Sequence, residues 1–338
     1  MQMKSQGLDS LLARVTAYHP EADTALIRRA YEFGDHHHTG QLRKSGEPYF
    51  THPTAVAHII TDLRLDTSSI IAALLHDTVE DTKATLEDVA REFGDDVAFL
   101  VDGATKLAKF NFSSKEDRQA ESFRKMLLHM AKDIRVLLVK LADRLDNMRT
   151  LDHMKPDAQE RIARETVEIY APLCNRLGIG WMKSELEDLA FKHMEPDGYK
   201  LLSDKTAALV KQREDYIART SAVLRGRLSE AGFAVKVDGR VKHLYSIWRK
   251  MQSQSCEFEQ VYDIIAFRAN VESVAECYAA LGVVHGMYTP IPGRFKDYIA
   301  LPKPNGYQSL HTTVIGGERE QMEVQIRTHA MHAVAEFG

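Results

Sequence analysis

Residues 68–81 read SSIIAALLHDTVED, an apolar run that ends in one histidine and three acidic residues within six positions. The apolar run, with serine at its start, predicts a buried helix. His76 and Glu80 are four residues apart, as are Asp77 and Asp81, so each pair should lie along one side of that helix. Charged groups this dense rarely enter a core unless a metal or tight pairing compensates them. His76 and Asp77 are therefore predicted to form half of a metal site.

Two further ligands are predicted from other helices. His52 stands directly before a proline that suits the first turn of a helix, and Asp143 stands near the polar end of another apolar segment. The complete set offers two nitrogen and two oxygen ligands, which suits manganese, with zinc and iron as alternatives. Its order along the chain resembles the metal signature of the HD phosphohydrolases. Taken singly, His52 is more often a packing residue and Asp143 a salt-bridge partner, and the histidines at 36–38 are interpreted as helix surface.

The composition fits a cytoplasmic enzyme. The chain has 338 residues, of which 44% are hydrophobic and 27% charged, enough for two domains with ordinary cores. A net charge of −4 gives no general attraction to nucleic acid or lipid. Residues 1–6 lack an apolar signal region and no apolar stretch is long enough to span a bilayer, so no membrane partner is expected. The cysteines lack ligand spacing and predict free thiols in a reducing compartment: Cys174, Cys256 and Cys277.

The pattern of the chain changes near residue 200. Before it, helical periodicity predicts segments at 25–37, 53–63, 69–77, 86–93, 119–132, 134–149, 157–177 and 182–193. A break at 195–198 precedes a long helix predicted at 199–231. Strands are then predicted at 233–237, 263–269, 312–315 and 321–326, alternating with helices at 243–252 and 274–287. We therefore predict an all-α domain at 1–195 and an α+β domain with a mixed sheet at 196–338.

The second half combines basic groups with two acidic residues and a loop tyrosine. The basic groups near predicted strand and helix ends are Arg240, Lys242, Lys250 and Arg268. Alternation places Glu323, Gln325 and Arg327 on one face of the last strand. Such groups suit a triphosphate substrate, with Asp263 and Glu323 holding magnesium and Tyr307 stacking on a base. Alone, a basic strand face is more often a solvated surface, and Tyr307 is more often a packing residue.

Four longer motifs stand in order along the chain: RKSGEPY at 43–49, HDTVED at 76–81, LADRLDNMRT at 141–150 and the loop at 293–311. Together they resemble the catalytic half of a long RelA/SpoT homolog, one of the bifunctional Rel enzymes of the bacterial stringent response. The resemblance implies an HD-type hydrolase domain that removes the 3′-pyrophosphate of (p)ppGpp. It also implies a nucleotidyltransferase-like (polymerase-β-like) synthetase domain that makes (p)ppGpp from ATP and GDP or GTP.

Carried over by motif, the resemblance assigns roles in the hydrolase domain. The manganese ligands would be His52, His76, Asp77 and Asp143. The residues that orient and activate the attacking water would be Glu80 and Asp81. The guanosine side of the substrate would meet Arg43, Lys44 and Ser45, and its ribose and phosphate would meet Asn147 and Thr150.

The resemblance also assigns roles in the synthetase domain. Asp263 and Glu323 would hold magnesium, and Glu323 would also deprotonate the 3′-hydroxyl of the acceptor. Adenine would lie against Arg240 and Arg268, and the ATP phosphates against Lys242, Ser246 and Lys250. Guanine would stack on Tyr307 in an acceptor pocket with Lys303, Asn305, Gln308, His311 and Gln325. Arg294 and Lys296 resemble the basic variant of bifunctional members, so both reactions are predicted.

Two positions depart from the family pattern. Thr78 stands where an apolar residue is usual and should be mild, whereas Asp146 stands where histidine is usual. We expect Asp146 either to point to solvent or to alter metal affinity.

Three alternatives stay open. They are a SpoT-like enzyme that is mainly a manganese-dependent hydrolase, an HD nucleotidase whose second half only binds nucleotides, and a polymerase-β-like enzyme that extends RNA. Long members continue into regulatory domains, so the chain is interpreted as a truncated catalytic fragment. Ribosome and uncharged tRNA are expected as partners only through that missing region.

Overall fold

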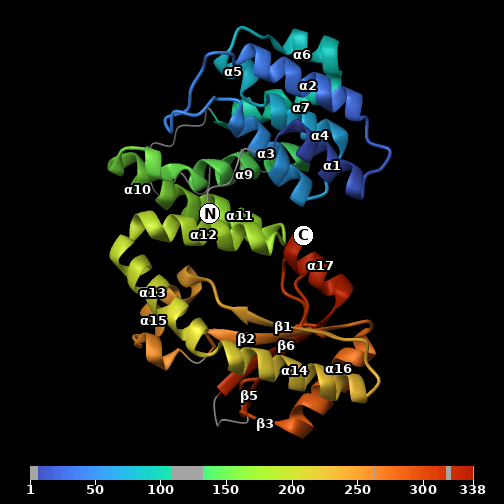
Figure 1. The fold of residues 1–338 in the computed structure, drawn as a ribbon, viewed down its shortest axis with the longest axis vertical. Coiled ribbons are helices and arrows are strands. Elements are labelled where there is room, and N and C mark those ends of the chain that lie inside the picture. Colours follow the sequence, from blue (N-terminus) through green and yellow to red (C-terminus); the bar gives the residue numbers. More distant parts are fainter. Residues whose placement is uncertain (1–6, 109–131, 262, 317–320, 338) are drawn as a thin grey trace. The chain divides into compact units, whose positions relative to one another are not determined.

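The computed structural model describes residues 7–108, 132–261, 263–316 and 321–337. The chain divides into two compact units, Met1–Tyr170 and Ala171–Gly338 (Figure 1). In the described residues the first unit is helical, and the second combines helices with a mixed sheet, which confirms the predicted fold class. The functional boundary at 195/196 stays a prediction. None of the described helices is long and apolar enough to cross a membrane.

The first unit is built from helices of ordinary length. They are α1 (Leu8–Tyr18), α2 (Thr24–His37), α3 (Thr51–Asp62), α4 (Thr67–Leu75), α5 (Thr78–Asp81), α6 (Leu86–Phe93), α7 (Asp95–Ala108), α9 (Ile134–Arg149) and α10 (Pro156–Glu165). Single turns follow at Leu151–His153 and Thr166–Tyr170. Helices α1 and α7 were not predicted, and most of the helix predicted at 119–132 lies outside the described residues.

Helix α4 forms the centre of the first unit. Its residues from Ser69 to Leu75 are all buried, because the run is apolar and helices α3, α7 and α9 pack against it. Asp66 caps its N-terminus by accepting from the Ser69 backbone N–H at 2.9 Å. The helix ends at Leu75, so the predicted continuous helix to Asp77 is wrong: His76 and Asp77 form a turn before α5.

The second unit carries seven helices in its described residues. They are α11 (Ala171–Arg176), α12 (Gly180–Met194), α13 (Pro196–Gln212), α14 (Glu214–Glu230), α15 (Leu244–Gln254), α16 (Val274–Met287) and α17 (His329–Phe337). The long helix predicted at 199–231 is two helices that meet at Arg213, and the one predicted at 157–177 is interrupted by the turn at Thr166–Tyr170.

The sheet sets the positions of the second site. Its strands are β1 (Lys236–Val241), β2 (Ile265–Val271), β3 (Thr289–Pro290), β4 (Lys296–Asp297), β5 (Leu310–Ile315) and β6 (Gln321–Thr328). The order is β1-β2-β6-β5-β3, with β4 paired to β5 and only β2–β6 parallel. Strand β1 begins at Lys236, three residues later than the predicted start at 233.

The two faces of the sheet differ in chemistry. Apolar residues such as Val324 and Ile326 belong to a core cluster with residues of helices α14 and α16, which lie against the sheet in Figure 1. On the other face, the register aligns one row of polar side chains across four strands: Arg268, Gln325, His311 and Lys296. The alternation of strand side chains therefore gathers these four predicted synthetase residues on one face.

Candidate active sites

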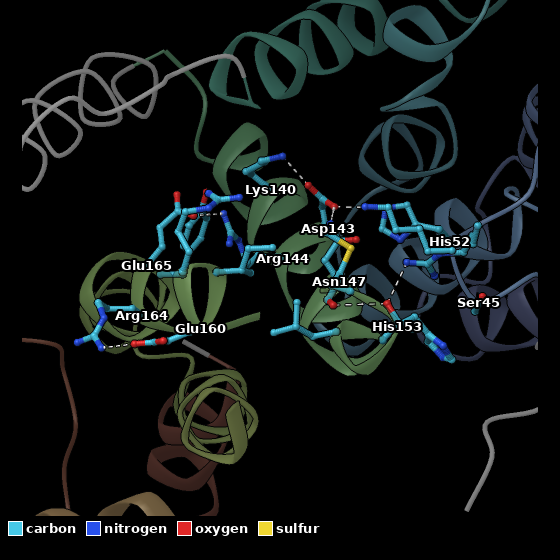
Figure 2. Close-up of a pocket in the computed structure, with 18 of the residues that line it drawn as sticks. Ser45, His52, Lys140, Asp143, Arg144, Asn147, His153, Glu160, Arg164 and Glu165 are labelled. Carbon is cyan, nitrogen blue, oxygen red and sulfur yellow. Dashed lines mark hydrogen bonds and ion pairs between the residues drawn. The ribbon is translucent and has the colours of Figure 1, made fainter. Parts of the chain in front are cut away.

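Three predicted metal ligands meet in the buried centre of the first unit. His52 lies on α3, His76 directly after α4 and Asp143 on α9, and one ligand atom of each lies within 4.8 Å of the others. The Asp143 Oδ1 atom is 3.2 Å from His52 Nε2 and 3.9 Å from His76 Nε2. Figure 2 shows His52 and Asp143 pointing toward one another from their helices. Packing of α3, α4 and α9 thus brings together residues that are 91 positions apart (143 − 52).

Asp77 completes the group from a less buried position. Its two carboxylate oxygens lie 3.2 Å from His76 Nε2 and 3.6 Å from His52 Nε2. The Tyr49 hydroxyl donates to Asp77 Oδ2 at 2.8 Å and to Asp81 Oδ2 at 2.7 Å. Burial and the neighbouring Asp77 raise the pKa of Tyr49, so it stays a proton donor. Sequence reasoning missed Tyr49, although it stands only three positions before His52.

Both imidazoles present Nε2 to the centre because their Nδ1 atoms are engaged. His76 Nδ1 lies 2.8 Å from the Ala73 carbonyl, and His52 Nδ1 lies 2.6 Å from Asp146 Oδ2. The buried His76 Nε2 has no hydrogen-bond partner. Orphaned buried polar atoms are rare, and imidazole ligands usually have the other nitrogen held in this way. The residues therefore fit a divalent cation.

The charges at this centre also fit a cation. Burial opposes the charged form of His52, but hydrogen bonds to Asp143 and Asp146 raise the pKa of its imidazole to about 9. Burial would likewise keep Asp143 neutral, but Lys140, together with the two histidines, holds the pKa of that carboxyl well below its usual range. Without a metal, protonated groups compensate the carboxylates. A divalent cation would supply the same positive charge.

Asp143 is held by two neighbours on its own helix. Lys140 Nζ donates to Oδ2 at 2.5 Å, and Asn147 Nδ2 donates to Oδ1 at 2.5 Å. Sequence reasoning missed Lys140, which the i,i+3 spacing could have indicated. Asn147 had been predicted to reach the ribose of a substrate, and here it supports Asp143.

An open cavity of about 1230 Å³ adjoins the metal-ligand group (Figure 2). Its lining includes all five residues predicted to bind the guanosine substrate: Arg43, Lys44, Ser45, Asn147 and Thr150. Four further cations and five acidic residues also line it: Lys140, Arg144, Arg161, Arg164, Asp143, Asp157, Glu160, Glu165 and Glu168. The size of the cavity and the cations among these groups suit a nucleotide with several phosphates.

The predicted water-activating acids lie at the edge of this arrangement. Glu80 is exposed on α5, and Asp81 is exposed while accepting from Tyr49. The interpretation of the histidine run as mostly helix surface agrees with the exposed His36 but is wrong for His38, which is 2% exposed and stacks on the Tyr49 ring at 4.8 Å. Its Nε2 also lies 3.4 Å from the Thr78 hydroxyl, which is why a polar residue is accommodated at that buried position.

The second candidate site begins at Asp263. Lys242 Nζ donates to Asp263 Oδ2 at 2.6 Å and Lys250 Nζ donates to Oδ1 at 2.7 Å. Burial alone would raise the pKa of Asp263, but these two lysines lower it. On β6, Gln325 Nε2 donates to Glu323 Oε1 at 2.6 Å, and His311 Nδ1 lies 3.6 Å from the same oxygen. The carboxylates are thus engaged by side chains of the predicted site.

The predicted guanine platform is also occupied by its neighbours. The Lys303 ammonium lies 5.0 Å from the centre of the Tyr307 ring, and the Tyr307 hydroxyl lies 2.7 Å from His311 Nε2. Burial and nearby cations lower the pKa of His311 to about 3, so it is neutral at physiological pH. Asn305 Nδ2 donates to the Asn175 carbonyl at 2.8 Å, and Gln308 Nε2 to the Ile299 carbonyl at 3.2 Å.

A buried arginine pair lies beside this platform. Glu336 on α17 contacts Arg268 at 3.3 Å and Arg327 at 3.2 Å. The Arg327 side chain is 1% exposed and was not among the predicted site residues. Burial, together with the charges of Arg327 and Arg240, lowers the pKa of Arg268 to about 10. Arg240 and Ser246 are half-buried, and Arg294 and Lys296 are exposed near β4.

Comparison with known proteins gives matches to two families and many relatives. Residues 30–180 match the family described as HD domain, and residues 239–338 match the region found in RelA / SpoT proteins. The chain is 56% identical over 327 residues to the GTP pyrophosphokinase of Myxococcus xanthus, covering 96% of this chain and 43% of that protein. It is 55% identical over 318 residues to the probable guanosine-3′,5′-bis(diphosphate) 3′-pyrophosphohydrolase of Synechocystis sp., covering 94% and 42%.

A third relative carries both activities in its name. The chain is 49% identical over 330 residues to the bifunctional (p)ppGpp synthase/hydrolase SpoT of Escherichia coli, covering 98% of this chain and 47% of that protein. The chain thus spans somewhat under half the length of these relatives.

Proposed function

Because its two regions match the HD domain and the region found in RelA / SpoT proteins, we propose that the chain hydrolyses (p)ppGpp in its first unit and synthesises (p)ppGpp in its second. The observation that carries the hydrolase proposal is the convergence of His52, His76 and Asp143 within 4.8 Å, beside a cavity that Arg43 and Lys44 line. The chain has the residues that were predicted for both sites, and the names of the three relatives cover both activities.

In the hydrolase, His52, His76, Asp77 and Asp143 would hold manganese. A bound divalent cation would act as a Lewis acid and would lower the pKa of the attacking water, so that a carboxylate side chain could accept its proton. Asp81, fixed by Tyr49, and Glu80 would orient the water and accept its proton. Water attacks the phosphorus attached to the 3′-oxygen, the P–O3′ bond breaks, and pyrophosphate and GDP or GTP leave. Arg43, Lys44 and Ser45 would bind the guanosine side of the substrate.

In the synthetase, the 3′-hydroxyl of GDP or GTP attacks the β-phosphorus of ATP and AMP leaves. Glu323 would accept the hydroxyl proton, and with Asp263 it would hold magnesium, for which carboxylate oxygens are suitable ligands. Basic side chains around Asp263 would clamp the phosphates, so positioning and electrostatics would provide most of the catalysis. Tyr307 would stack on guanine once Lys303 has moved from its ring.

The alternative is a SpoT-like enzyme in which manganese-dependent hydrolysis dominates and synthesis is weak.

Product analysis tests both proposals. The chain is incubated with ATP, GDP and each metal, and separately with ppGpp, and the nucleotides are separated. AMP with a pyrophosphorylated guanosine supports synthesis, and GDP with pyrophosphate from ppGpp supports hydrolysis. Hydrolysis with manganese but no AMP-linked synthesis would refute the bifunctional proposal and leave the alternative. Absence of product from both incubations would refute both proposals.

A further inference from the structure

Asp146 occupies a position that a solvent-facing acid would not. It lies on α9, three residues after Asp143, and its side chain is 6% exposed. Its Oδ2 atom is 2.6 Å from His52 Nδ1 and 2.9 Å from the Arg43 NH1 atom. The expectation that Asp146 points to solvent is therefore wrong.

This contact determines which nitrogen of His52 faces the metal-ligand group. A carboxylate at Nδ1 holds a proton there, which leaves Nε2, the nitrogen that faces Asp143 and Asp77, as the one that would bind a metal. The partner histidine, His76, obtains the same orientation from the Ala73 carbonyl. The two imidazoles thus have equivalent supports, one from the main chain and one from the side chain of Asp146.

The same carboxylate also connects the ligand group to the cavity. Arg43 binds Asp146 through NH1, and its NH2 atom donates to the Thr150 hydroxyl at 3.1 Å. That hydroxyl in turn donates to the Asp146 carbonyl at 3.1 Å. Arg43 and Thr150 both line the cavity. One buried side chain therefore contacts a metal-ligand histidine and a cationic residue of the predicted substrate site.

We propose that Asp146 is a positioning residue that fixes His52 as a metal ligand and places Arg43 at the mouth of the same site. The proposal rests on the metal site of the proposed hydrolase. Asp146 would touch neither the metal nor the reacting atoms, and it acts through its two partners. Removing such an outer partner typically weakens metal binding about 10–100-fold.

Manganese binding provides a readout that is independent of catalysis. Free Mn²⁺ is followed by its electron paramagnetic resonance signal during titration of the chain, without nucleotide. We expect Asp146→Ala to weaken the Mn²⁺ Kd by about 10–100-fold. Asp146→Asn keeps an acceptor oxygen without the charge and should weaken it less. Asp35→Asn, an exposed aspartate of α2, serves as the matched control and should bind like the unchanged chain.

Circular dichroism of the metal-free variants separates positioning from folding. If Asp146 were only structural, the variants would lose Mn²⁺ affinity only as the temperature approaches their unfolding midpoint. If Asp146 positions His52, the variants bind Mn²⁺ more weakly even at temperatures far below that midpoint. If Asp146→Ala does not fold, the Asp146→Asn variant decides. Unchanged affinity in the folded variants would overturn this proposal and leave the hydrolase proposal intact. Absence of Mn²⁺ binding by the unchanged chain would overturn both.

Discussion

Replacing Lys140 by methionine should weaken the metal-free first unit and strengthen its response to manganese. Lys140 and Asp143 form an ion pair at 2.5 Å, with side chains 14% and 6% exposed. Removing one member of a buried pair typically costs about 3–5 kcal/mol. Asp143 keeps its hydrogen bond from Asn147, so we expect about 3 kcal/mol. For a domain of this size that is a loss of about 6–12 °C in unfolding midpoint.

Manganese should reduce this loss, because a cation at the ligand group replaces the missing positive charge. Binding at about 100 times Kd stabilises the unchanged chain by about 2.7 kcal/mol. The gain should be larger in Lys140→Met, since no ammonium then competes for Asp143. The assay is thermal unfolding across a Mn²⁺ series. Lys106→Met is the control, because its pair with Asp102 is 59% and 31% exposed and should contribute under about 1 kcal/mol. Equal unfolding midpoints of Lys140→Met and Lys106→Met would refute the reasoning. A difference between their midpoints that does not change with manganese would refute it as well.

Three further changes probe other parts of the first unit. Gly34→Ala puts a methyl group against the buried Phe50 ring and should cost about 1–3 kcal/mol in chemical denaturation; a neutral result would contradict the close packing. Arg135 lowers the pKa of Asp96 below its ordinary value of 3.8, so the ion pair stabilises the fold above about pH 4 and this contribution is lost at lower pH. The unfolding of Arg135→Met should therefore depend less on pH in the acid range. Identical pH profiles of the variant and the unchanged chain would argue against the ion pair. Tyr49→Phe should lower the rate of ppGpp hydrolysis about 10–100-fold with little change in KM; full activity would exclude its role in orienting the acids.

The sequence predicted the residues that meet in the first site but not the side chains that support them. Spacing and residue type single out His52, His76 and Asp143, because few other roles demand such groups beside apolar helices. Tyr49 has an unremarkable local pattern, and Asp146 stands out only as a departure from the family pattern; the contacts of both depend on which helices face each other. Helical periodicity gives the buried face of a helix but not its partner across the core, so these contacts required the folded structure.

The same limit applies to element boundaries. The apolar run at 68–75 predicted α4, but nothing in its periodicity marks the turn at His76 and Asp77. The break at Arg213 is likewise missed, because both flanking helices continue the same polar-amphipathic pattern. In the sheet, strand alternation correctly grouped Glu323 with Gln325, since a period of two is fixed by backbone geometry.

The two histidines are held by supports of different kinds, so they should differ in their sensitivity to substitution. The Ala73 carbonyl that holds His76 belongs to the main chain and survives any side-chain replacement at that position. The support of His52 is a single side chain, which one codon change can replace. Natural variation at position 146 can therefore retune this half of the centre gradually, whereas the His76 half can drift only if the end of α4 itself is rebuilt.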